Sequence, residues 1–430
     1  MERLLELARK RADRVEVYGK DSAGNSVSFE DGRLKDIDSS FSSGVGLLVM
    51  KDGKLGRAYT RNLNDRSGLV DNALAGLAGG VEAGYELPGA AELPGLSSYD
   101  PTIEGLTSTA LAAECERLVA AVGGRARAQV NISAGREVET VRVLNSSGAD
   151  FTARSSQYYG YLSLLYPGSY SSISRLTFGK GFARFPDQDL EFVVDTFNRS
   201  AGERKPAAGK TRVLFLPEQV YALAWRLTTA TRGKEVFEGV SPLKDKVGQP
   251  VLSKLLTAVD EPLNDAWPGA RAFDDEGTPC RDFALFEDGV LRGFYFDRYY
   301  AWKAGVEPTG HGYRPDITGR TGPQLGHLAI RPGDTSFADL LKEMGTGVVV
   351  AGVLGAHSGN ILNGDYSIGL SPGLWVENGE IAGHVKDAMV AGNVYEDLKN
   401  VVAVGNRQHA AHMGRFPALL LDGVSFATRG

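Results

Sequence analysis

The stretch Met344–Val385, MGTGVVVAGVLGAHSGNILNGDYSIGLSPGLWVENGEIAGHV, decides how the rest of the chain is interpreted. It begins where the helical pattern LLKEM ends at Gly345 and Gly347, and the apolar run Val348–Leu354 then predicts a buried strand. Glycines and polar side chains dominate from Ser358 to Gly383, with too little apolar material for an ordinary buried layer. Glycine-rich backbone suits tight turns, and it equally suits the close approach of a ligand or a second chain.

Two Asn-Gly pairs in this stretch are typical of hairpin turns. Asn363-Gly364 and Asn378-Gly379 both match type I′ turns, whose two central residues have positive φ angles. Turns account for these pairs, whereas the Tyr, Trp and His side chains between them also fit a functional surface. Both interpretations stay open on the sequence pattern alone.

Composition defines a globular protein and argues against several kinds of partner. The 430 residues, 42% of them hydrophobic, are enough to bury the cores of about two to three domains. The 47 basic and 53 acidic residues give a formal charge of -6 without a Lys/Arg block, so we expect no direct nucleic-acid binding. No run reaches the ~20 apolar residues of a membrane span, and the charged N-terminus lacks a signal-peptide pattern. We therefore expect a cytoplasmic protein without membrane attachment.

Hairpin and helix signals in the first 205 residues predict an antiparallel sheet with covering helices. Strand patterns occur at 15–18, 26–29, 32–37, 44–50, 55–60, 128–133, 137–144 and 149–154, and several are joined by turn residues at 31–32, 51–54 and 145–148. Helical patterns, two of them with candidate N-caps, occur at 64–84, 107–122 and 188–198. The polar segment 201–210, which contains Pro and Gly, predicts a boundary between an N-terminal α/β domain, 1–205, and a C-terminal domain, 206–430.

The second half predicts a mostly antiparallel β domain. An apolar strand at 211–216 leads through Pro217 into a helix at 218–231, and a late helix is expected at 336–344. Short strand patterns separated by Asp-Gly and Asn-Gly turns fill the remainder. Because the helices are bunched instead of alternating strictly with strands, the predicted class is α+β, and a doubly wound sheet fits poorly.

The histidines and cysteines do not form a conventional catalytic site. Among the six histidines only His409 and His412, in HAAH, are close enough to share a helical face, and no carboxylate neighbours them. Ser358 has no identifiable triad, and Cys115 and Cys280 form neither a CxxC motif nor a disulfide framework. The acids before Cys280 would raise the pKa of its thiol and oppose nucleophilic activation.

Two further features leave alternatives open. The acids Asp274, Asp275 and Glu276 either bind a cation or form a type I turn, and we favour the turn. His311, between two glycines in Thr309-Gly310-His311-Gly312, either meets a substrate or lies on a flexible loop.

Several stretches together resemble the TldD/PmbA family, also known as the modulators of DNA gyrase. They are FDDEGTPCRDFALFEDGVLRGFYFDRYYAWKAG (273–305), PTGHGYR (308–314), LLKEMGTG (340–347), NGDYSIGLSPGLWVENGEIAGHV (363–385) and NVVAVGN (400–406). Their order and spacing also match, and GVGLLVMKDGKLGRAYT (44–60) and LNSSGADF (144–151) resemble the family more weakly. The chain is most similar to the PmbA/TldE-like branch.

This resemblance implies the non-metal-binding subunit of a heterodimeric metallopeptidase. The TldD branch carries a zinc-binding HExxxH helix, whereas the corresponding helix here, YALAWRLTTAT at 221–231, has neither His nor Glu. No metal ligand and no catalytic residue can therefore be assigned to this chain, and zinc is expected in a TldD-like HExxxH partner subunit. The implied substrates are small or unfolded peptides, including antibacterial-peptide precursors and antitoxins. Any link to gyrase would then be indirect.

Within this interpretation the chain forms the wall of a shared cavity and holds an extended peptide by strand pairing. We expect substrate contacts from His311, Asp365, Tyr366 and Trp375, although Tyr366 and Trp375 equally fit a core or an interface. The isolated chain is expected to be able to form a homodimer. The alternatives are a homodimeric peptide-binding or regulatory protein without catalysis, and a stand-alone hydrolase with an unrecognised site.

Overall fold

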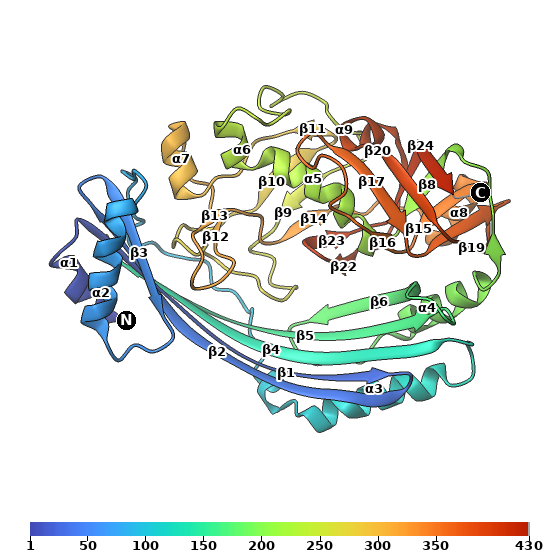
Figure 1. Cartoon of the computed structure of the whole chain (residues 1–430), viewed down its shortest axis with the longest axis horizontal. Helices are drawn as coiled ribbons and strands as arrows, with labels where there is room; N and C mark the ends of the chain where they lie inside the picture. The colour runs from blue at the N-terminus through green and yellow to red at the C-terminus, as the bar shows by residue number, and fades with distance from the viewer. Residues whose placement is uncertain (429–430) are drawn as a thin grey trace.

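The first half of the chain is built on long antiparallel hairpins (Figure 1). The computed structural model describes residues 1–428. The strands are β1 (Arg14–Glu30), β2 (Arg33–Lys51), β3 (Lys54–Thr60), β4 (Gln129–Asn145), β5 (Asp150–Leu165) and β6 (Ser172–Gly179). They form a six-stranded sheet in the order β3-β2-β1-β4-β5-β6. The helices are α1 (Glu2–Arg9), α2 (Arg66–Ala75), α3 (Ser108–Val122) and α4 (Asp187–Arg199), with 3₁₀ turns η1 (Gly76–Gly79) and η2 (Pro101–Gly105).

Several of the expected short strands are parts of one longer strand. The segments 15–18 and 26–29 both lie in β1, 32–37 and 44–50 both lie in β2, and 128–133 and 137–144 both lie in β4. The polar residues between them, such as Lys20, have backbone partners on both sides, Gly44 in β2 and Val141 in β4. Because ladder hydrogen bonds use only backbone groups, a strand continues through residues that show no apolar alternation.

The hairpin turns follow the sequence signals with one exception. Asp31-Gly32 and Asn378-Gly379 have positive φ at both residues, as type I′ turns require, and the turn at Lys51–Lys54 has the same feature at its centre. The prediction for Asn363-Gly364 was wrong. Only Gly364 has a positive φ there, and the pair lies in a loop before a strand instead of joining two paired strands.

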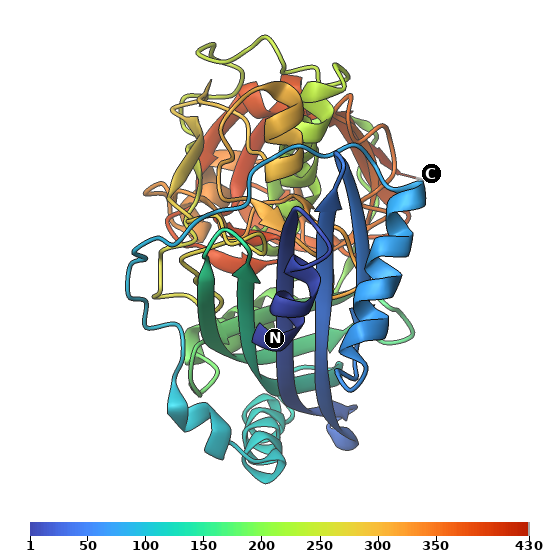
Figure 2. The same cartoon turned by 90° about the vertical axis from the view of Figure 1, so that its left-hand side faces the viewer.

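The predicted helices of the first half are present, and two of them, α2 and α3, have side-chain caps. The Asp65 side chain accepts the Gly68 N–H before α2, and the Thr107 hydroxyl accepts the Ala110 N–H before α3. Figures 1 and 2 place α3 on one face of the sheet and the second half of the chain on the other. The sheet therefore lies between two layers.

The second half contains two larger sheets and a two-stranded ribbon. Its strands are β7 (Glu203–Arg204), β8 (Gly209–Phe215), β9 (Ala258–Asp260), β10 (Phe283–Glu287), β11 (Val290–Leu291), β12 (Gly312–Tyr313), β13 (Gly322–Pro323), β14 (Leu328–Ile330), β15 (Gly347–Val350), β16 (Val353–Leu354), β17 (Asp365–Leu370), β18 (Gly373–Glu377), β19 (Glu380–Val385), β20 (Ala388–Asn393), β21 (Val401–Val404), β22 (His409–Ala411), β23 (Gly414–Phe416) and β24 (Leu419–Thr428). Its helices are α5 (Tyr221–Thr231), α6 (Gly233–Phe237), α7 (Arg298–Ala304), α8 (Phe337–Met344) and α9 (Val394–Asp397), with η3 (Pro217–Gln219) and η4 (Leu398–Asn400).

Strand pairing in the second half is mostly antiparallel, as predicted. The ten-stranded sheet runs β16-β17-β20-β24-β8-β15-β18-β19-β7, with β21 paired to β24, and the six-stranded sheet runs β11-β10-β9-β14-β23-β22. Parallel pairs occur between β8 and β15, β7 and β19, and β14 and β23. The α+β class is confirmed. The helix expected from Glu218 starts at Tyr221, after the 3₁₀ turn η3 that Pro217 begins.

One apolar cluster, the shared core, joins the two halves of the chain. It includes Leu164 and Ile173 of the first sheet, Val193 of α4, Leu340 of α8 and Leu374 of β18, all nearly inaccessible to solvent. The predicted boundary at residues 205 and 206 falls between β7 and β8, which both belong to the ten-stranded sheet. Within residues 1–428 no helix has the length and apolar character needed to cross a membrane.

Candidate functional site

Helix α5 forms one wall of a cavity of about 940 Å³. The lining residues come from α5 and α6, from α7, from the segment around β12 and β13, and from two later loops. They are Tyr221, Trp225, Arg232, Lys234, Tyr300, Tyr313, Pro315, Arg320, Thr321, Gly322, Pro323, Gln324, Ala356, His357, His412 and Met413. A concave site of this size, lined by both aromatic and polar side chains, is typical of ligand binding, for which roughly 300–1,000 Å³ is usual.

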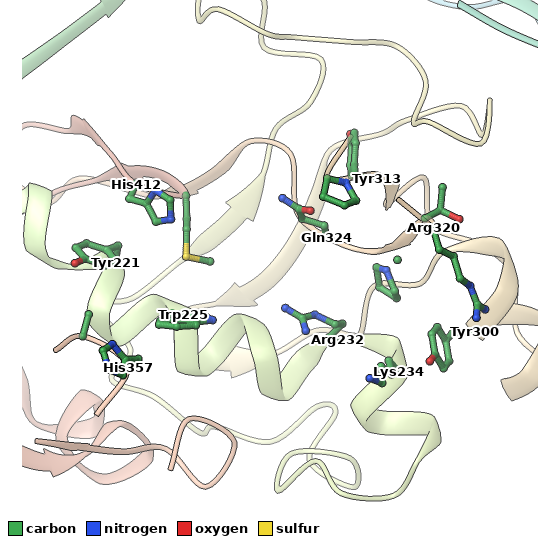
Figure 3. Close-up of a pocket in the computed structure, with 16 residues that line it drawn as sticks. Tyr221, Trp225, Arg232, Lys234, Tyr300, Tyr313, Arg320, Gln324, His357 and His412 are labelled. Atoms are coloured by element: carbon green, nitrogen blue, oxygen red, sulfur yellow. The ribbon is translucent and has the colours of Figure 1, made fainter. Parts of the chain in front are cut away.

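The two ends of the cavity differ in chemistry (Figure 3). Tyr221 and Trp225, one turn apart on α5, lie at one end with His357 and His412, and the rings of Tyr221 and His412 are 5.7 Å apart. Arg232, Lys234, Arg320 and Tyr300 lie at the other end, beyond the C-terminus of the helix. The first end is aromatic and the second is cationic.

The cationic end is not neutralised by its own lining, since none of the lining residues is Asp or Glu. Arg232 lies 3.3 Å from the Glu235 carboxylate, but its Nε is buried without a hydrogen-bond partner. The Arg320 guanidinium stacks on the Tyr299 ring at 3.7 Å, and its Nη2 is also buried without a partner. This end therefore offers donors to an anionic group.

A buried arginine on α5 holds the loop that supplies Ala356 and His357. Arg226 is fully buried, and its guanidinium donates to three backbone carbonyls of the loop: Ala356 at 3.1 Å, Ser358 at 2.7 Å and Asp365 at 2.8 Å. A fourth bond of 2.5 Å goes to Ala222 within the helix. Backbone carbonyls thus accept the hydrogen bonds of the Arg226 guanidinium. No carboxylate lies within 4.0 Å of it in the described part of the chain. This loop is the glycine-rich middle of the stretch Met344–Val385.

The acids Asp274, Asp275 and Glu276 hold the opposite wall. The Asp274 carboxylate accepts the Gly312 N–H at 2.8 Å, and Glu276 accepts the Thr321 hydroxyl at 2.8 Å, so both ends of the β12–β13 segment are fixed. The Gly277 N–H donates to the Asp274 carbonyl at 3.0 Å, which confirms the turn. Burial, together with the charge of Glu276, raises the pKa of Asp274 to about 8.

His311 is buried beneath this wall. Its Nδ1 lies 2.8 Å from the Thr309 hydroxyl and its Nε2 lies 3.4 Å from the Asp260 carboxylate, and only 1% of the residue is exposed. Of the two alternatives left open for His311, this burial does not fit the flexible loop. A Cβ at Gly310 would lie 2.8 Å from the carbonyl oxygen of Pro279, so the glycine permits tight packing instead of providing mobility.

The other residues expected to contact substrate lie apart from the cavity. The Asp365 side chain is exposed, while Tyr366 is buried in the core and donates to the Asp397 carboxylate at 2.7 Å. The half-buried Trp375 donates its indole N–H to Glu377 at 2.9 Å. None of these three residues, nor His311, lines the cavity, and their contact with a substrate stays a prediction.

The side chains present do not fit a bound metal ion. Helix α5 has no His, Cys, Asp or Glu, and within residues 1–428 no group of three or more such side chains is arranged to hold a metal. His409 and His412 share no helical face, because residues 409–411 form strand β22. Cys280 is buried, and burial raises the pKa of its thiol far above the usual value, as expected for an unreactive cysteine.

Sequence reasoning missed the residues that make the cavity. Tyr221 and Trp225 carry a detectable signal, since their spacing places two aromatic side chains on one helical face. Arg226 is a single cation in an otherwise uncharged helix, which also stands out. Lys234 and Arg320 are far apart in sequence and show no local pattern.

The chain thus combines a mixed α+β fold in two packed halves with an aromatic and cationic cavity beside α5, a helix that carries no metal-ligating side chain. Models of the PmbA/TldA metallopeptidase C-terminal domain and of PmbA/TldA metallopeptidase domain 1 match residues 208–428 and 15–84. The chain belongs to the TldD/PmbA metallopeptidase family. The absence of HExxxH from α5 is consistent with the PmbA/TldE-like branch of the family.

Relatives cover almost the whole chain. The metalloprotease PmbA of Escherichia coli O157:H7 is 28% identical over 94% of this chain and 89% of its own length. The crystal structure of TldE from Thermococcus kodakarensis has the same fold, with a TM-score of 0.92, 22% identity and 99% coverage of both chains. A Thermotoga maritima structure, proposed to be a modulator of a DNA gyrase, has a TM-score of 0.86, 27% identity and 99% coverage of both chains.

Proposed function

We propose that this chain is the non-metal-binding subunit of a cytoplasmic heterodimeric peptidase of the TldD/TldE type. The observation that carries this proposal is helix α5, where aromatic side chains face a cavity and no metal ligand is present although the family is one of metallopeptidases. Peptide-bond hydrolysis would take place on a partner subunit that bears HExxxH. This chain would contribute to proteolysis by binding and orienting the peptide.

The cavity supports a role in holding small or unfolded peptides. Tyr221 and Trp225 offer apolar ring surface, and Arg232, Lys234 and Arg320 offer donors. From Tyr221 to Arg232 the helix rises about 16 Å at ~1.5 Å per residue, which matches about five residues of extended peptide at ~3.3 Å each. A folded domain would not fit in about 940 Å³.

Co-expression with an HExxxH-bearing paralogue tests the proposal. We expect the two chains to co-purify, zinc to be present at one ion per pair, and an unfolded peptide such as reduced, denatured casein to be cleaved only by the pair. A variant of the paralogue with its HExxxH glutamate changed to glutamine keeps the assembly but should abolish cleavage. Zinc and cleavage that stayed with the present chain alone would contradict the assignment of roles, and a stable homodimer that ignores the paralogue would favour a regulatory peptide-binding protein.

A further inference from the structure

The cationic end of the cavity has more positive charge than a general peptide-holding role requires. Arg232, Lys234 and Arg320 line this end, and only Arg232 has a carboxylate within 4.0 Å among the described residues. Clustered cations repel one another, and an anion that enters between them stabilises the cluster.

Two buried N–H groups at this end have no acceptor within the protein. They are Nε of Arg232 and Nη2 of Arg320. Buried donors in folded proteins are nearly always hydrogen-bonded, so an unpaired one is unfavourable. These two atoms are closed off from solvent, so an entering ligand would meet the other parts of the Arg232, Lys234 and Arg320 side chains, which line the cavity. A carboxylate brings several acceptor positions for such donors.

The nearest buried acid does not neutralise Arg320. Asp297 is fully buried, and burial with the nearby charge of Glu276 raises its pKa to about 8, even though Arg320 favours its ionised form. Burial thus opposes an ion pair between Asp297 and Arg320.

The aromatic end provides the second half of a binding site. Tyr221 and Trp225 lie at the other end of the cavity along α5, and His357 and His412 lie beside them in Figure 3. Apolar side chains of a short peptide would pack at this end, while its anionic group would lie among the three cations. The two ends thus fix the direction in which a peptide lies.

We propose that the cavity beside α5 is a carboxylate-reading peptide site, in which Lys234 and Arg320, supported by Arg232, bind the carboxylate of an extended peptide. This inference rests on the proposed function, since it names the chemical feature by which the chain selects its peptides. The carboxylate comes either from the C-terminus of the peptide or from an acidic side chain near that end.

Binding of N-acetylated hexapeptides to the full chain tests the proposal. The probes are acetyl-AFAFAA with a free C-terminal carboxylate, its C-terminal amide, and the amide of acetyl-AFAFAE, each measured by isothermal titration calorimetry. We expect the free acid to bind at least about tenfold tighter than the amide, because a charge-assisted bond contributes about 1.5–3 kcal/mol. Recovery of affinity by the AFAFAE amide shows that a side-chain carboxylate is accepted, and no recovery shows that the C-terminus is read.

Charge-removing variants locate the carboxylate. Lys234→Gln and Arg320→Gln should each weaken binding of the free acid at least about fivefold while changing binding of the amide less than about twofold. Arg320→Lys keeps the charge and should retain most of the preference. Lys246→Gln, an exposed lysine outside the cavity, is the matched control and should change neither. Circular dichroism and a melting curve for each variant show whether it is folded.

Equal binding of acid and amide, or no binding of any probe, would overturn the carboxylate-reading site. This failure is distinguishable from failure of the proposed function. If the pair with the HExxxH paralogue cleaves peptides without preferring free acids, the subunit role stands and the carboxylate site is wrong. If the present chain prefers free acids but no paralogue forms an active pair with it, the carboxylate site stands and the subunit role is wrong.

Discussion

Removing the Arg226 side chain should release the loop that closes the cavity. In Arg226→Met the carbonyls of Ala356, Ser358 and Asp365 lose their donor, and an unsatisfied buried carbonyl costs about 1–3 kcal/mol. Relief from burying a cation offsets part of this loss, because a guanidinium held only by dipoles is itself costly to desolvate. We expect the free energy of unfolding to fall by about 3 kcal/mol.

Urea unfolding followed by tryptophan fluorescence measures this change, and hydrogen exchange locates it. Amides of residues 355–365 should exchange faster in Arg226→Met, while those of the first sheet should change little. Arg292→Met, which removes an exposed ion pair with Glu287, is the control and should stay within ~0.5 kcal/mol of the wild type. A loss below ~1 kcal/mol together with unchanged exchange at 355–365 would refute the anchoring role of Arg226.

Three further predictions concern buried polar groups and close packing. Burial raises the pKa of Asp297 to about 8. Its contribution to the free energy of unfolding is therefore complete below about pH 4 and disappears as the pH rises through about 8. Over this pH range the melting temperature of Asp297→Asn should fall less steeply than that of the wild type. Tyr366→Phe removes the 2.7 Å bond to Asp397 and should lower the free energy of unfolding by about 1 kcal/mol in urea titrations; an unchanged midpoint would show that water replaces the bond. In Gly352→Ala the new Cβ would clash with the carbonyl oxygen of Ser371, a backbone atom. We expect the free energy of unfolding to fall by more than ~2 kcal/mol, or little folded protein to form. A wild-type melting temperature would contradict this packing.

Local signals predicted the turns and caps well, because these depend on a few neighbouring residues. Asp31-Gly32 and Asn378-Gly379 form their predicted turns, and the Asp65 and Thr107 side chains cap α2 and α3. Strand lengths were not predictable from the same signals. Residues 20–25 have no apolar alternation, yet they pair with β2 and β4, because partners on both sides satisfy their backbone groups.

The cavity could not be predicted because its residues have no common spacing. Tyr221 and Arg320 are almost a hundred positions apart, and only the pair Tyr221 and Trp225 on α5 shows a local spacing. Searches for metal and nucleophile patterns depend on fixed spacings, whereas dispersed cations are brought together only by the fold. His311 shows the opposite case, since its flanking glycines resemble those of an open loop but serve a close packing contact.

The shared core determines whether the two halves of the chain can be produced separately. Leu164 and Ile173 of the first sheet lie in the same apolar cluster as Leu340 and Leu374 of the second half. A fragment that ended near residue 205 would expose this apolar surface to water and would tend to aggregate. Two fragments produced together in one cell should instead reassemble, so the protein is better suited to fragment complementation than to separate production of its halves.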